Sequence, residues 1–319
     1  MRPALLVFLY AVALAWYVPV PLRRLTARGI SPRLGLAAWL TAMASALASA
    51  AMALQLLIGA AVAGWSGLAE VVCRSVTGGS CAPAVYRSAI FELALGVAAV
   101  AAALTAAVLV WRYGRKVQRA QRQTRAHAEV ARITGHRLPG AGGAVVLDAP
   151  QPAAYCVPGR PATIVLTSGA LGVLDRAQLT AVLAHERAHL AGRHHLLIAL
   201  TRALAACLPM VPLFTEGPAE VARLAEMCAD DDAARRSGRR TLIAALLAMG
   251  TGTAVPAAAL AATGCATMAR VQRLMEPPRR ARHARYGLAL ATAIFLLVLI
   301  SGLLTIFAGP LAAHGIAAV

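Results

Sequence analysis

The stretch Leu183-Ala184-His185-Glu186-Arg187-Ala188-His189 decides how the rest of the chain is interpreted. Its two histidines are four positions apart, and on an α-helix such residues point within about 40° of each other. Both imidazoles can therefore reach one metal ion, as in zinc sites of the HExxH type. Glu186 adjoins the first histidine and can accept a proton from a metal-bound water. The stretch predicts one Zn²⁺ per chain, with His185 and His189 as ligands.

The residues around this motif predict a buried helix that follows short strands. Asp175 is an expected N-cap, and Gln178 three residues later completes a capping box. Apolar residues then recur at helical spacing and form a buried stripe: they are Leu179, Val182, Leu183 and Leu190. Before the helix, β-type runs cover Ala144–Leu147, Ala154–Val157 and Ala162–Thr167. Pro158-Gly159 predicts a hairpin between the last two strands.

A catalytic zinc site of this type needs a third protein ligand and an open position for water. Downstream, Glu226 and Asp230 lie one helical turn apart. We predict that Glu226 is the third ligand and that Asp230 hydrogen-bonds a ligand imidazole. The alternative is that both belong to a solvated acidic helix face. His194 lies about 180° from His185 on an ideal helix, so we expect His194 and His195 to cap the helix end or contact lipid headgroups.

Composition indicates a membrane protein. Of the 319 residues, 59% are hydrophobic and 14% are charged, and the mean hydropathy is +0.67. A soluble domain of this length would be far more polar. The formal charge of +18 comes from basic residues clustered beside apolar runs, the pattern of cytoplasmic flanks that face anionic lipid. No aromatic-basic platform accompanies the charge, so direct nucleic-acid binding is not expected.

Four apolar runs are predicted to span the bilayer; they cover residues 4–20, 34–65, 89–111 and 286–307. The basic connections between them predict an N-terminus outside the cell membrane and a catalytic domain in the cytoplasm. The expected fold is a mainly α membrane protein with a cytoplasmic α+β zincin-like domain between the third and fourth spans. The predicted domains are residues 1–111, 112–285 and 286–319. Cys73 and Cys81 share an outer loop, where a disulfide and two unpaired thiols are both open.

Two other apolar stretches lie inside the predicted cytoplasmic domain. Residues 196–214 are almost long enough to cross, but one crossing would separate Glu226 from the two histidines. We therefore expect this segment either to pack as an in-plane or core helix or to dip into the bilayer and return. Residues 241–262 are interrupted by glycine and proline, which favours buried domain helices over a span.

A family resemblance rests on a series of motifs. They are Tyr155-Cys156-Val157-Pro158-Gly159, Ile164-Val165-Leu166-Thr167-Ser168-Gly169-Ala170-Leu171, the HExxH helix, the ExxAD stretch at 226–230, and Arg270-Val271-Gln272-Arg273-Leu274. Together they resemble the membrane gluzincins: the BlaR/MecR-type antirepressor metallopeptidases and, more distantly, the HtpX-like and CAAX-processing proteases. Three predicted spans before the zinc domain and one after it resemble the BlaR/MecR plan.

The resemblance implies roles for individual residues. It makes His185, His189 and Glu226 zinc ligands and Glu186 the catalytic base, with Asp230 behind a ligand. It also implies that the strand at 154–157 is an edge that pairs with substrate, which would bring Tyr155 to the peptide.

Two departures from these families change the expectation. HtpX-like proteases usually carry Asn-Ala where this chain has Ala153-Ala154. Only about a dozen residues follow the fourth apolar run, and there is no Ser-x-x-Lys. We therefore do not expect direct β-lactam sensing through a BlaR/MecR-type sensor domain.

The expected activity is hydrolysis of an internal peptide bond in a cytoplasmic or membrane-proximal protein. Arg223 or Arg270 could stabilise the developing oxyanion, or each could be a structural ion-pair partner. The resemblance suggests a BlaI-like winged-helix repressor as substrate. The alternatives are a broad-specificity quality-control protease of the membrane and a non-catalytic membrane scaffold for signalling.

Overall fold

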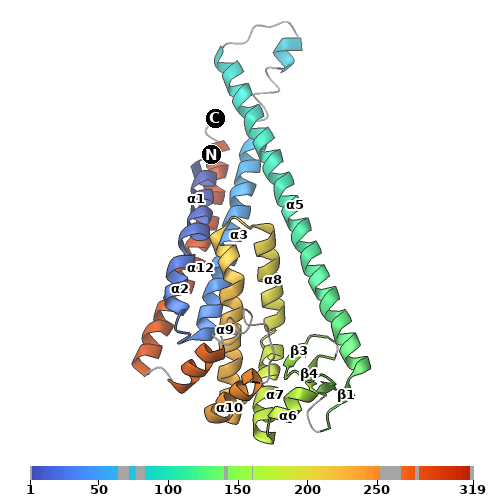
Figure 1. Cartoon of the computed structure of the whole chain (residues 1–319). Helices are drawn as coiled ribbons and strands as arrows, with labels where there is room; N and C mark the ends of the chain where they lie inside the picture. The colour runs from blue at the N-terminus through green and yellow to red at the C-terminus, as the bar shows by residue number, and fades with distance from the viewer. Residues whose placement is uncertain are drawn as a thin grey trace.

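A computed structural model of the chain describes residues 2–63, 72–76, 83–139, 143–159, 161–251, 267–276 and 280–316. Long helices run side by side, and a small sheet lies at one end of the assembly (Figure 1). The helices are α1 (Arg2–Tyr17), α2 (Pro19–Thr26), α3 (Pro32–Ala63), α5 (Pro83–Thr134), α6 (Ser168–Val173), α7 (Arg176–Ala191), α8 (His194–Cys207), α9 (Pro212–Ser237), α10 (Arg239–Thr251) and α12 (Arg280–Ile316). Residues 72–76 and 267–275 are also helical.

Three helices are long and apolar enough to cross a membrane. Their candidate spans are residues 32–62 of α3, 89–134 of α5 and 281–304 of α12. The run predicted at 4–20 is not one straight helix, because α1 ends at Tyr17 and α2 starts at Pro19 with a bend of 41°. Proline lacks an N–H and disrupts a continuing helix. The described residues therefore contain three candidate spans, or four if α1 and α2 form one bent span.

Helix α5 continues without a break from the third predicted span into the basic segment that follows. Its 52 residues correspond to a length of about 78 Å. At the predicted domain boundary, the Arg115 guanidinium stacks 4.7 Å above the ring of Trp111. The far end of α5 reaches the sheet (Figure 1), where Ala128 and Ala131 pack against Val157 and Val165.

The sheet has the strand order β1-β2-β4-β3, with β1 at His136–Arg137, β2 at Val145–Leu147, β3 at Ala154–Val157 and β4 at Thr163–Thr167. The predicted hairpin is confirmed, since β3 and β4 pair antiparallel with Tyr155 opposite Val165. Strand β2 is parallel to β4, which leaves β3 at an edge of the sheet. The two-residue β1 and the short α6 were not predicted.

Helix α7 carries the HExxH motif and begins as the sequence predicts. The Asp175 side chain accepts from the Gln178 N–H at 2.8 Å, while the Gln178 side chain accepts from the Asp175 N–H at 3.0 Å. This capping box satisfies amide donors at the start of the helix. Val182 and Leu183 then pack onto the sheet residues Ile164 and Leu166. The strands therefore fix the position of the motif.

Helices α8 and α9 form a hairpin that enters the bundle of long helices. The chain turns after Cys207 and returns along α9, so residues 196–214 do not make a single crossing (Figure 1). Leu213 and Phe214, just after the turn, are buried with Trp39 of α3 and Leu297 of α12. The turn after Cys207 is compatible with both predicted alternatives, a packed core helix and a segment that dips into the bilayer and returns, so the choice between them stays a prediction.

Two other predictions have different outcomes. Helix α10 has 13 residues, too few to span a bilayer, and residues 252–266 lie outside the described part of the chain. Cys81 also lies outside the described residues, so the choice between a disulfide with Cys73 and two unpaired thiols stays open.

Candidate metal centre

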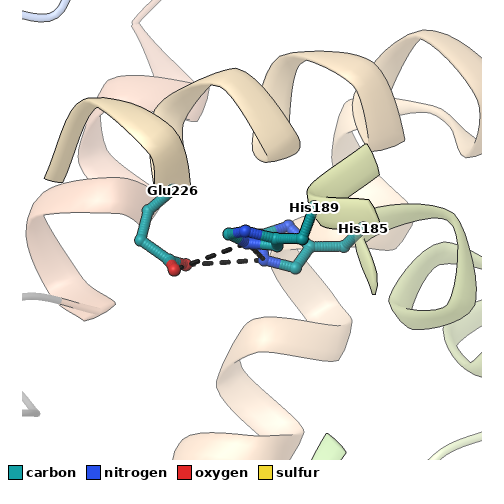
Figure 2. A group of neighbouring side chains, drawn as sticks. All are labelled: His185, His189 and Glu226. Carbon is teal, nitrogen blue, oxygen red and sulfur yellow. Dashed lines mark hydrogen bonds and ion pairs between the residues drawn. The ribbon is translucent and has the colours of Figure 1, made fainter. Parts of the chain in front are cut away.

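Side chains from two helices converge on one point. His185 and His189 point from α7 toward Glu226 of α9 (Figure 2). The Nε2 atoms of the two histidines are 3.1 Å apart. The Glu226 carboxylate approaches both of them, with Oε2 3.4 Å from His185 Nε2 and Oε1 3.4 Å from His189 Nε2. The three residues predicted as ligands are therefore neighbours in the structure.

This donor set fits a Zn²⁺ ion. Two imidazole nitrogens and one carboxylate are a common protein ligand set for catalytic zinc, with the fourth position left for water or substrate. Tetrahedral coordination with bonds of about 2.0–2.1 Å places ligand atoms about 3.3 Å from one another. The 3.1 Å between the two Nε2 atoms is close to that value, and each Nε2 has one Glu226 oxygen at 3.4 Å, Oε2 for His185 and Oε1 for His189. The site requires little rearrangement to hold the ion.

Asp230 lies behind His185. Its carboxylate is fully buried, and Oδ1 is 3.2 Å from His185 Nδ1. Arg270 binds the same carboxylate twice, with Nε donating to Oδ2 at 2.8 Å and Nη2 donating to Oδ1 at 2.6 Å. Its remaining nitrogen Nη1 is 3.1 Å from Glu226 Oε2. Arg270 therefore orients one predicted ligand directly and a second through Asp230.

His194 occupies the equivalent place behind His189, which the sequence did not reveal. The two Nδ1 atoms are 3.0 Å apart, and His194 is buried. The expectation that His194 caps the helix or meets lipid headgroups is wrong, because it assumed that α7 continues as one ideal helix. Instead α7 ends at Ala191, and Arg193 adopts the left-handed conformation with φ 49°, which turns His194 back toward the motif. The one signal in the sequence was Gly192, a common residue at helix ends.

The charges of the cluster favour a bound cation. Burial opposes protonation of His185, but hydrogen bonds to Asp230 and Glu226 raise its pKa to about 9. For Glu226, burial is outweighed by hydrogen bonds from His185 and His189, and the pKa lies well below its ordinary value. Burial and then the charge of His189 lower the pKa of His194 to about 4. The buried carboxylates therefore draw positive charge to the ligand nitrogens while His194 stays neutral.

Glu186 lies beside the predicted ligands at the edge of strand β3. Its side chain is buried, and this burial raises its pKa. The thiol of Cys156 hydrogen-bonds the Glu186 carboxylate, and burial followed by this acidic neighbour raises the pKa of Cys156 to about 12. The thiol therefore stays protonated and donates to Glu186. Sequence reasoning gave no role to Cys156, because a lone cysteine in a strand carries no spacing signal.

Of the other residues singled out in the sequence, some line the cleft of the metal centre and one lies elsewhere. Tyr155 lines the cleft of about 640 Å³ that contains the cluster, and its hydroxyl is 3.1 Å from His127 Nε2 on α5. His195 lines the same cleft. Arg223 instead donates to the Thr26 carbonyl at 3.0 Å and to Glu220 at 2.7 Å. Of the two alternatives for Arg223, these contacts correspond to the structural ion-pair partner, which ties α9 to the end of α2.

Comparisons with known proteins agree with this geometry. The model of the family described as Peptidase family M48 matches residues 115–277, a range that contains the whole cluster. A protease HtpX homolog from Acidiphilium cryptum (strain JF-5) is 40% identical over 68 residues, which are 21% of this chain and 24% of that protein. The matched part thus spans about a quarter of that curated relative. No solved structure matches the chain.

Proposed function

The chain belongs to peptidase family M48, and we propose that it is an integral membrane zinc-dependent endopeptidase. The proposed ligands of one Zn²⁺ per chain are His185, His189 and Glu226. The observation that carries this proposal is that their ligand atoms lie within 4.8 Å of one another. Two of them come from α7 and the third from α9, and Glu226 follows His189 by 37 positions in the sequence, so helix periodicity alone cannot explain their meeting.

Each neighbouring residue has a role that follows from its contacts. A bound Zn²⁺ would polarise a water molecule and the scissile carbonyl. Glu186 would take a proton from the water and deliver it to the leaving amine, and a raised carboxyl pKa suits a group that must both accept and donate. Asp230 and His194 would hold the two ligand imidazoles at their Nδ1 atoms. Arg270 would neutralise Asp230 and keep the Glu226 carboxylate in place.

The edge strand β3 offers a place for the substrate backbone. Within the described residues, β3 pairs only with β4, and Tyr155 and Cys156 of β3 line the cleft. A peptide added along the free edge would gain backbone hydrogen bonds without a requirement for a particular sequence. This arrangement supports cleavage inside an extended segment of a protein.

We place the catalytic domain, residues 112–285, in the cytoplasm and the N-terminus outside, with α1 and α2 together as the first of four spans. The support is the clustering of arginines around the sheet end of the candidate spans, at residues 23–33, 112–125 and 279–285. Three spans before the domain and one after it correspond to the BlaR/MecR-type plan. By that analogy, the proposed substrate is a BlaI-like winged-helix repressor.

The variant Glu186→Gln tests the proposal. Zinc content and peptide cleavage would be measured on the purified, detergent-solubilised protein. We expect about one zinc per chain in wild type and variant, with turnover reduced at least 10²-fold in the variant only. Glu276→Gln makes the same chemical change at an exposed site and should cleave like wild type. Purified wild type without stoichiometric zinc, or full activity of Glu186→Gln, would overturn the proposal.

The same variant separates the physiological alternatives in cells. Proteins that accumulate in the Glu186→Gln strain are the candidate substrates. Accumulation of a single DNA-binding repressor would support regulatory proteolysis, whereas many unrelated membrane proteins would indicate quality control. A cellular phenotype that Glu186→Gln leaves intact would instead indicate a non-catalytic scaffold.

A further inference from the structure

A second, larger cavity adjoins the cleft of the metal centre. It has a volume of about 1000 Å³ and lies between α5, the α7–α8 junction and the turn after β3. Pro158 and Gly159, directly after β3, form part of its wall, and His195 lines both this cavity and the cleft. A peptide paired along β3 would therefore run from the metal centre into this cavity, which we call the distal chamber.

The wall of the distal chamber is basic. Arg125 of α5, Arg132 of α5 and Arg193 at the α7–α8 junction line it, against the single acidic residue Glu129. Arg132 is paired with Glu129 at 2.7 Å, so these two charges offset each other. The side chains of Arg125 and Arg193 make no hydrogen bond or ion pair with any residue that the structure describes. Two uncompensated positive charges therefore face the chamber.

Arg193 is also the only non-glycine residue with a positive φ in the described part of the chain. A left-handed backbone is unfavourable for a residue with a Cβ atom, whereas glycine adopts it freely. Such conformations concentrate at functional sites. Arg193 supplies one of the two unpaired charges of the chamber although its left-handed backbone is unfavourable. A glycine at this position would remove the unfavourable conformation, but it would also remove the charge.

We propose that the distal chamber selects substrates with acidic residues on the amino-terminal side of the scissile bond. This inference rests on the proposed protease function. Strand β3 runs from the cleft at Ala154 toward the chamber at Pro158. A peptide added antiparallel to β3 therefore passes through the chamber before it reaches the metal centre. Pro158 lies four positions beyond Ala154, about 13 Å at 3.3 Å per residue, so the chamber begins within about four residues before the bond that is cleaved.

Peptides with a single variable block test this selectivity. The block, at positions three to five before the scissile bond, holds Glu, Gln or Lys. We expect wild type to cleave the Glu peptide with a kcat/KM about tenfold or more above that of the Lys peptide. This difference should shrink at high salt, because exposed charges are screened. A second peptide set, with the block on the carboxyl side, should show no such preference.

Reversing the charge of a residue in the distal chamber tests whether the chamber causes the preference for acidic peptides. Arg125→Glu should invert the order of the Glu and Lys peptides. Arg122→Glu makes the same change on the same helix at an exposed position outside the chamber wall and should keep the wild-type order. Arg193→Asn removes the other charge with a residue that tolerates the left-handed conformation. It should reduce the preference, and it provides an independent test if Arg125→Glu does not fold.

The outcomes keep this inference separate from the proposed function. Equal cleavage of the three peptides by wild type would overturn the acidic preference and leave the protease intact. A preference confined to the carboxyl-side peptides would overturn the proposed direction of binding. If no peptide is cleaved, fluorescence anisotropy with Glu186→Gln still measures binding. Tighter binding of the Glu peptide that Arg125→Glu abolishes would support the chamber, and equal binding of all peptides would reject it.

Discussion

The Nδ1 atom of His194 lies 3.0 Å from the Nδ1 atom of His189. A histidine that ligates a metal through Nε2 carries its proton on Nδ1, which must donate to an acceptor. His194 can accept only while it is neutral, and its pKa of about 4, lowered by burial and by His189, keeps it neutral near pH 7. The contact therefore selects the His189 tautomer that binds metal.

We predict that His194→Ala weakens zinc binding about 10- to 100-fold, the usual effect of losing a partner behind a metal ligand. Zinc affinity would be measured by competition with a chelator. Gly192→Ala should act in the same direction, because an added Cβ at position 192 collides with the His194 ring. His195→Ala is the matched neighbour and should leave zinc affinity unchanged. An unchanged affinity in His194→Ala would show that the contact does not position His189.

The pH dependence of zinc binding follows from His185. With its pKa raised to about 9 by Asp230 and Glu226 against the effect of burial, His185 is protonated at pH 7 in the absence of metal. Zinc must displace this proton. We therefore expect zinc affinity to rise about tenfold per pH unit up to about pH 9 and to level off above it. Chelator competition from pH 6.5 to 9.5 measures the slope, and a flat profile would contradict the prediction.

Asp230→Asn provides the control for this pH effect. Asp230 raises the pKa of His185, so its removal should lower that pKa and shift the plateau of zinc affinity to lower pH. The stability of the metal-free protein changes with pH in the opposite direction from zinc affinity. A raised folded-state pKa stabilises the protein fully below the unfolded value of about 6.5. That contribution is lost as the pH rises through the folded value.

Much of the site could be predicted from the sequence because it depends on short-range spacing or on residue types that are characteristic of zinc ligands. The spacing of His185 and His189 on one helix and the capping box at Asp175 both depend on residues within one or two turns. The prediction of Glu226 as third ligand depends on a helix distant in sequence, and it rests only on the ligand chemistry of catalytic zinc. The sheet hairpin followed from a local turn at Pro158-Gly159.

The parts that could not be predicted depend on changes of direction or on tertiary contacts. The role of His194 depends on a change of backbone direction at Arg193. The expectation for His194 assumed an ideal helix that continues past this residue. Arg223 and Arg270 were equivalent in sequence, and only packing separates them: Arg223 contacts α2, whereas Arg270 contacts Asp230. Proline at positions 19 and 21 was visible, but the size of the bend between α1 and α2 was not.

The buried pair of Arg270 and Asp230 predicts a non-additive effect on stability. Arg270→Leu leaves the fully buried Asp230 carboxylate without its two hydrogen bonds. Breaking a buried pair in this way costs about 3 kcal/mol or more. Combining it with Asp230→Asn removes the buried charge that Arg270 no longer pairs, so the double variant should be more stable than Arg270→Leu alone at a pH above about 9, where His185 is also neutral. Thermal unfolding of the metal-free protein in detergent measures the cycle, and additive losses would show that the two residues act independently.

The α8–α9 hairpin predicts a cysteine-accessibility pattern. Met210, in the turn between the helices, is 83% exposed, and Leu213 and Phe214, three and four residues later, pack among the candidate spans. We propose that this turn lies within the bilayer, where an exposed apolar side chain contacts lipid. In a background without the six native cysteines, Met210→Cys in intact membranes should react poorly with a maleimide, because the reactive thiolate does not form in hydrocarbon. Arg236→Cys, near the other end of α9, should react readily.

Denaturation in detergent supplies the reference for this comparison, since both cysteines should then react to the same extent. Rapid labelling of Met210→Cys in the native membrane would place the turn in water. The hairpin would then be a soluble element that packs beside the spans. Protection of Met210→Cys would instead fix the depth of α9. Because Glu226 lies about four turns beyond Met210 on the returning helix, that depth limits how far from the membrane a substrate can be cleaved.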